Sequence, residues 1–335
     1  MALDNLIVGT SSLQNIYPRF IGTKVLDKDF YGLASTRVSD SIDKDPTEQV
    51  ANSIIAAFRW AAKNKVQVWI LPELCLDKIG LRHLVDLMRN NASSLKMVLA
   101  GSTYISLKTG GFVNQAKIIT TQPKLEMFTY NKTIPFNMQI DTESSVPDIY
   151  KISNDAAEAK CNFLKEDFVP GEKLLILPLD GLKVGIAICK DVLDPFDARN
   201  PLAAYIREKV DIMLVTSMNS GHTNLFTATA EAMARWHNCA TFYVNNLTSV
   251  SNAADKTVEM SFALLPNHTK IDGVQGCIYY RTAPTLNAID GLSTVESDTV
   301  VENIINTIIS RDVVAKALPS DGNVLYTIKN GMLEK

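Results

Sequence analysis

The stretch VGIAICKDVLDP, residues 184–195, begins with a run of apolar residues that stops abruptly at polar ones. Its first six residues predict a buried strand, and the Asp-Pro pair at 194–195 breaks the run. Between these parts the chain places a thiol, an ammonium group and a carboxylate in succession, at Cys189, Lys190 and Asp191. Because the ends of buried strands commonly carry function in α/β folds, the stretch indicates a fold class and a candidate nucleophile, Cys189.

On both sides of this stretch, short apolar runs alternate with segments of helical pattern. Residues 45–65 predict a helix with Asp45 as its N-cap, Pro46 at its first position and Glu48 placed for a capping box. The other expected helices are 81–92, 201–209 and 225–238, and the expected strands are 31–39, 66–73, 96–105, 112–120, 124–130, 173–179, 182–189, 211–218 and 241–247. This alternation predicts an α/β fold in which helices cover the sheets. The polar stretch 137–165 is expected to be a surface excursion or lid.

Composition and charge exclude several classes of protein. The chain has 335 residues, 46% of them hydrophobic, and a net charge of −3, which suits one large domain or two small ones. The sequence has no stripe of basic residues of the kind that binds nucleic acid. No apolar run reaches the roughly 18 residues that a membrane span needs. The first residues lack the features of a signal peptide, so we expect a cytoplasmic protein without membrane contact.

The cysteines and histidines do not form a pattern typical of a structural or metal site. The five cysteines are widely spaced and contain no CxxC pair, which argues against a disulfide framework and against a zinc ribbon. The four histidines are scattered, so we expect no metal and no cofactor. Taken singly, each cysteine is most simply a small buried hydrophobic residue.

Three expected strand ends carry reactive groups of complementary chemistry: Glu73, Lys132 and Cys189. Each alone has a simple structural interpretation, as a helix cap, a solvated lysine and a core thiol. Together they supply a base for the thiol proton, a nucleophile, and a cation for a developing oxyanion. The neighbouring ammonium group is expected to favour the thiolate, making Cys189 the most reactive of the five thiols.

The segments LPE (71–73), YNK (130–132) and GIAICKD (185–191) resemble, in the same order, the Glu, Lys and Cys motifs of the nitrilase, or carbon–nitrogen hydrolase, superfamily. EDFVPG (166–171) resembles the segment that carries the family's second glutamate, which implies that Glu166 is a supporting residue. The resemblance implies a nitrilase-like, four-layer α-β-β-α sandwich.

The resemblance also divides the chain into three parts. Residues 1–30 are an N-terminal extension, residues 31–250 form the nitrilase-like core, and residues 251–335 are a divergent C-terminal part of the same domain. The family's habit of pairing sandwiches further implies a homo-oligomer.

The activity that the resemblance implies is thiol-dependent hydrolysis of a non-peptide carbon–nitrogen bond in a small amide-like molecule. Glu73 takes the thiol proton, Cys189 attacks, and Lys132 with the backbone N–H of Lys190 stabilises the oxyanion before water releases the acid from a thioester. An amidase is favoured over a nitrilase, and acyl transfer to another acceptor stays open.

Two other classes of function remain as alternatives. The first is a nitrilase-like binding or regulatory module that has lost turnover. The second is a papain-like Cys–His enzyme, which ranks low because no histidine lies in a matching motif.

Overall fold

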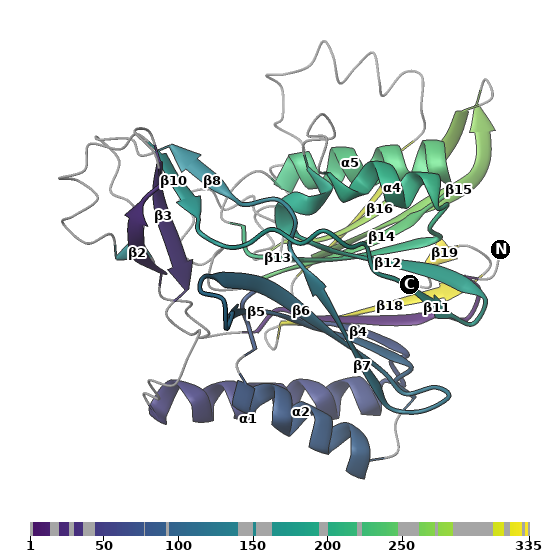
Figure 1. Ribbon diagram of the computed structural model, residues 1–335. Coiled ribbons are helices and arrows are strands. Elements are labelled where there is room, and N and C mark those ends of the chain that lie inside the picture. Colours follow the sequence, from purple (N-terminus) through teal and green to yellow (C-terminus); the bar gives the residue numbers. More distant parts are fainter. Residues whose placement is uncertain are drawn as a thin grey trace.

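The computed structural model describes residues 3–13, 20–26, 30–35, 44–76, 78–91, 94–139, 150–151, 163–193, 200–219, 223–246, 261–271, 274–283, 311–317, 322–329 and 332–333. These residues form a sandwich of two sheets between two layers of helices (Figure 1). The predicted four-layer α-β-β-α architecture is confirmed.

The first sheet has seven strands in the order β19-β18-β1-β4-β5-β6-β7. Its strands are β1 (Ile7–Ser11), β4 (Val68–Ile70), β5 (Met97–Ser106), β6 (Phe112–Thr120), β7 (Glu126–Asn131), β18 (Asn323–Lys329) and β19 (Met332–Leu333). Helices α1 (Lys44–Lys63) and α2 (Lys78–Asn90) cover its outer face (Figure 1). Residues such as Ile54 and Phe58 on α1 and Leu84 on α2 join Trp69 and Val98 of the sheet in one buried apolar cluster.

The second sheet also has seven strands, in the order β11-β12-β13-β14-β15-β16-β17. Its strands are β11 (Ile176–Leu179), β12 (Leu182–Ile188), β13 (Ile212–Ser217), β14 (Ala240–Asn245), β15 (Ser261–Ile271), β16 (Val274–Ala283) and β17 (Arg311–Ala317). Helices α4 (Pro201–Arg207) and α5 (Thr223–His237) cover its outer face, and a short 3-10 turn, η2 (Cys189–Val192), follows β12. Strands β12, β13 and β14 run parallel and are buried along most of their length, as a sheet with both faces covered requires.

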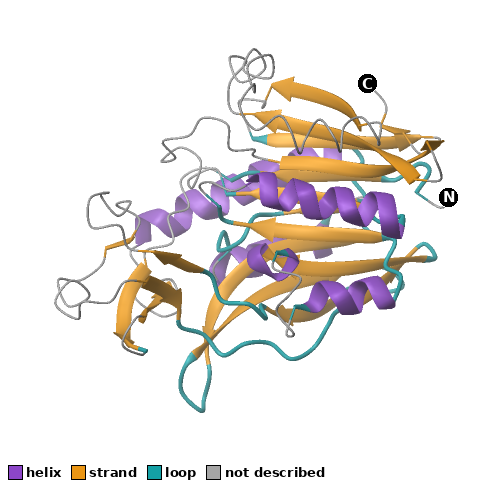
Figure 2. Ribbon diagram, turned by 90° about the horizontal axis from the view of Figure 1, so that it is seen from above, coloured by secondary structure: helices purple, strands orange, loops and turns teal. Residues whose placement is uncertain are grey.

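A third, smaller sheet lies at one side of the sandwich, on the side away from both chain ends (Figures 1 and 2). Its order is β8-β10-β3-β2-β9, formed by β8 (Asn137–Gln139), β10 (Phe163–Glu166), β3 (Phe30–Ser35), β2 (Phe20–Val25) and β9 (Tyr150–Lys151). The stretch 137–165, expected to be an excursion or lid, thus contributes strands to this sheet, and its remaining residues lie outside the described part. Residues 36–39 of the expected strand 31–39 also lie outside it.

Both ends of the chain enter the first sheet. Strand β1 lies between β18, to which it is antiparallel, and β4, to which it is parallel. The stretch predicted to be an N-terminal extension therefore supplies a central strand, and the C-terminal part supplies that strand's neighbour. Among the described helices, none combines the length and apolar character needed to cross a membrane.

Candidate active site

Glu73 lies just beyond β4, where the first sheet faces the second. Its backbone N–H donates to the Ser217 carbonyl at the end of β13, 3.3 Å away, and its side chain is buried. The turn closes on Gly101, whose φ is +69°; a Cβ there would lie 2.2 Å from the Pro72 carbonyl oxygen. A glycine at this point of β5 therefore lets the chain that carries Glu73 pack tightly against the sheet.

Lys132 follows β7 and is enclosed completely. Its backbone N–H donates to the Asn114 carbonyl at 2.8 Å, which fixes its place beside β6. Its Nζ donates to Glu73 Oε1 at 2.8 Å and to Glu166 Oε2 at 2.7 Å. Burial lowers the pKa of Lys132, but the charges of Glu166 and Glu73 outweigh it and hold that pKa well above its usual value. Lys132 is therefore a permanent ammonium between two carboxylates.

Glu166 is the last residue of β10, in the third sheet. Tyr104 OH donates to its Oε1 and the Phe136 N–H donates to its Oε2, both at 2.7 Å. With the bond from Lys132, these contacts leave the buried carboxylate fully paired. The third sheet therefore reaches the cluster directly, and Glu166 lies where a supporting residue would hold Lys132.

The Glu73 carboxylate receives two further donors that the sequence did not single out. Asn114 Nδ2 donates to Oε1 at 2.9 Å, and the Met218 N–H donates to Oε2 at 3.0 Å. Oε1 thus takes two donors, counting Lys132, whereas Oε2 takes one. Burial raises the pKa of Glu73, and the Lys132 charge opposes this rise. The carboxyl group is therefore closer to accepting a proton than an ordinary glutamate.

Cys189 begins the η2 turn directly at the end of β12. Its φ of +47° lies in the left-handed region, which residues with a Cβ rarely adopt and which is often found at functional sites. Burial, followed by the charge of Glu73, raises its pKa to about 12, while Lys132 lowers it. The Lys132 ammonium thus favours the thiolate, as expected, but desolvation outweighs it, so the sulfur rests as a neutral thiol that needs a base.

Asp191 ties the cysteine turn to the lysine segment. It is fully buried and accepts hydrogen bonds from the backbone N–H groups of Thr133 and Ile134, both at 2.9 Å. It also accepts from Tyr130 OH at 2.8 Å and from the Ile188 N–H at 3.3 Å. Burial raises its pKa to about 6. One carboxylate therefore holds together the two loops that carry Lys132 and Cys189.

The side chain of Lys190 is directed away from this cluster. Its Nζ donates to Asn137 Oδ1 at 2.8 Å, which joins η2 to β8 of the third sheet. The described residues contain no group of three His, Cys, Asp or Glu side chains that could hold a metal ion.

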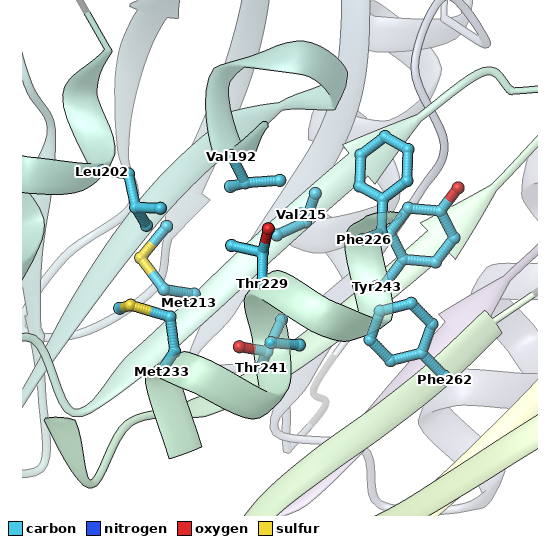
Figure 3. A pocket seen from close by; sticks show the side chains of 11 residues that line it. Val192, Leu202, Met213, Val215, Phe226, Thr229, Met233, Thr241, Tyr243 and Phe262 are labelled. Atoms are coloured by element: carbon cyan, nitrogen blue, oxygen red, sulfur yellow. The ribbon is translucent and has the colours of Figure 1, made fainter. Parts of the chain in front are cut away.

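A small cavity lies elsewhere, between α5 and the second sheet (Figure 3). Its volume of about 10 Å³ has space for roughly one water molecule. Its lining side chains are all uncharged: Val192, Leu202, Met213, Val215, Phe226, Thr229, Ala230, Met233, Thr241, Tyr243 and Phe262. None of the four clustered ionisable residues lines it, so this cavity belongs to the core and not to the candidate site.

The described residues thus define an α-β-β-α sandwich with a buried cluster of two carboxylates, one lysine and one thiol. No model of a known protein family matches the chain. No curated protein matches it either.

Among solved structures, the chain is similar to an amidase of the nitrilase superfamily from Nesterenkonia AN1, with 14% identity over 73% of this chain and 77% of the amidase and a TM-score of 0.41. It is also similar to the glutamine-dependent NAD+ synthetase of Acinetobacter baumannii, with 15% identity over 72% of this chain and a TM-score of 0.43. A third is the synthetase of Cytophaga hutchinsonii, with 12% identity over 83% of this chain and a TM-score of 0.43. The chain spans 38% and 43% of the length of these two synthetases.

Proposed function

We propose that this chain hydrolyses a non-peptide carbon–nitrogen bond of a small amide through a thioester on Cys189. One observation carries the proposal: a fully buried lysine is held between two buried carboxylates beside a thiol at a strained turn. Buried ion clusters contribute little net stability compared with apolar packing, so their presence calls for another explanation. Catalysis supplies one, because each group has a separate role.

The first step is proton transfer and attack. Glu73 takes the proton of the Cys189 thiol, and the sulfur attacks the amide carbonyl carbon as the carbonyl electrons move to oxygen. Lys132 and the backbone N–H of Lys190 stabilise the oxyanion. The raised pKa of Glu73 suits this role because it brings the acid closer to the pH at which the site works.

The second half of the reaction regenerates the thiol. The protonated Glu73 gives its proton to the leaving amine, and the C–N bond breaks to leave a thioester on Cys189. Glu73 then takes a proton from water, the resulting hydroxide attacks the thioester, and the acid leaves as the sulfur recovers its proton. Glu166 keeps Lys132 charged and fixed throughout, as its 2.7 Å contact with Nζ supports.

A screen of small amides, carbamoyl compounds and nitriles for release of ammonia or acid tests the proposal. We expect release from amides, and loss of at least about 10³-fold in Cys189→Ala, because a nucleophile of this kind cannot be replaced by its neighbours. Cys239→Ala is the matched control: it removes another fully buried thiol, at the other end of the second sheet's parallel strands, and should retain activity.

The same screen distinguishes the proposed hydrolase from the main alternative, a binding module without turnover. A binding module without turnover would bind members of the panel, as detected by a rise in melting temperature, without releasing product. Product release that Cys189→Ala does not reduce would overturn the proposal.

A further inference from the structure

Ser217 is the last residue of β13 and is completely buried. Its hydroxyl oxygen has no hydrogen-bond partner within the described part of the chain. Buried hydroxyls are nearly always paired, so an unpaired one in a reactive cluster requires an explanation. The Ser217 hydroxyl is therefore available to donate a hydrogen bond within the cluster.

The backbone of Ser217 holds this hydroxyl in a fixed place. Its carbonyl oxygen accepts hydrogen bonds from the N–H groups of Glu73, at 3.3 Å, and Asn246, at 3.1 Å. Strands β12 and β13 are parallel neighbours, and Ile188 pairs with Thr216. Ser217 and Cys189 are therefore the next residues along two adjacent strands, at the same end of the sheet.

The two side chains also interact electrostatically. The hydrogen bond that Ser217 can give to the sulfur lowers the pKa of Cys189, against the larger rise that burial and Glu73 cause. A neutral thiol is a weak acceptor, whereas a thiolate is a strong one. The hydroxyl consequently gains a good partner only when charge develops on the sulfur.

We propose that Ser217 is a further catalytic residue of this site, whose hydroxyl donates a hydrogen bond to the Cys189 sulfur as the thiol loses its proton. In this step the S–H bond breaks, the proton forms an O–H bond on Glu73, and the sulfur keeps the electron pair. Ser217 keeps its own proton throughout. Because a neutral thiol accepts this bond only weakly and a thiolate accepts it strongly, the bond stabilises the charged state selectively, as catalysis requires. Its role in turnover rests on the proposed amide hydrolysis, whereas its effect on the thiolate does not.

The test is the rate at which iodoacetamide alkylates Cys189, followed by peptide mass spectrometry between pH 6 and 10. We expect Ser217→Ala to slow this labelling by roughly ten- to a hundredfold at a given pH, the usual size of one hydrogen bond to a charged group. Ser217→Thr keeps the hydroxyl and should restore most of the rate. Ser217→Ala should not lower the melting temperature, because the hydroxyl has no partner to lose at rest.

Thr241→Val is the matched control. Thr241 lies on β14, has a buried hydroxyl that is likewise unpaired within the described residues, and occupies a position four residues before the end of its strand. Its removal should leave the labelling rate of Cys189 unchanged. Equal rates for wild type and Ser217→Ala, or an equal loss in Thr241→Val, would overturn the inference.

These outcomes separate the inference from the proposed function. Labelling needs no substrate, so a slower rate in Ser217→Ala supports the role of Ser217 even if wild-type protein hydrolyses nothing in the panel. With a working substrate, Ser217→Ala should lower kcat with little change in KM. A change in KM alone would mean that the hydroxyl contacts the substrate instead, and would overturn its role at the sulfur.

Discussion

Replacing Lys132 by methionine should destabilise the protein strongly and in a pH-dependent way. The side chain fits the space but removes the one positive charge between Glu73 and Glu166, to which Nζ lies at 2.8 and 2.7 Å. Breaking a buried ion pair by removing one partner costs about 3–5 kcal/mol. We therefore expect a loss of this size in the free energy of unfolding at pH 7.5.

The pH dependence follows from the two carboxylates that remain. Without Lys132 both are buried and repel each other, so the native state takes up a proton that the unfolded chain, with ordinary glutamate pKa values, does not. Stability then falls as pH rises, by up to about 1.4 kcal/mol per pH unit for one proton. The deficit of Lys132→Met relative to wild type should therefore shrink by roughly 2–3 kcal/mol between pH 7.5 and 5.5.

Urea unfolding followed by tryptophan fluorescence measures both quantities. Lys96→Met is the matched control, since Lys96 Nζ lies 2.6 Å from Asp180 Oδ2 in a pair that is partly exposed. It should cost no more than about 1 kcal/mol, with little dependence on pH. A deficit for Lys132→Met below about 1 kcal/mol, or one that is equal at both pH values, would mean that these charges are not buried in solution.

Three further predictions follow from the same contacts. Asp191→Ala should lower the free energy of unfolding by about 3 kcal/mol in urea titration, because four donors lose their buried acceptor, and equal stability to wild type would contradict this. Glu166→Gln should reduce kcat more than KM in a working amide assay, since Lys132 loses a charged partner while Glu73 stays in place; unchanged kcat would show that Glu166 only supports the fold. Light scattering at micromolar concentration should show a dimer, and Trp236→Lys should dissociate it. The reason is an uncharged, exposed face of α5, suited to contact with a second copy, formed by Leu225, Ala228, Ala232 and Trp236. A monomeric wild type would rule this out.

The layered architecture could be predicted from the sequence because apolar runs and helix signals are local properties. The helix predicted at 45–65 is α1, and the strands expected at 112–120 and 182–189 are β6 and β12. Strand β1 was not recognised, although IVGTS becomes a central strand, because its pairing with β18 joins residues more than 300 positions apart.

The candidate site was only partly predictable. Glu73, Lys132 and Cys189 could be named because their residue types fit one chemistry, and Glu166 because its segment resembles one of the nitrilase superfamily. Asn114 could have been noticed as an amide on the strand face that also carries Phe112, Ala116 and Ile118. Met218 could not have been identified from the sequence, because it contacts Glu73 through its backbone N–H, a group that nearly every residue carries. The size of the rise in the Cys189 pKa could not be predicted either, because desolvation depends on packing from several distant segments.

Mass spectrometry of the protein, quenched while it is incubated with a small amide, can detect the acyl group on Cys189 itself. We expect the peptide containing Cys189 to gain the mass of the substrate's acyl group, as a thioester that hydroxylamine removes and that Cys189→Ala cannot form. Release of ammonia or acid with no acyl adduct on this peptide, and at an equal rate in Cys189→Ala, would contradict it.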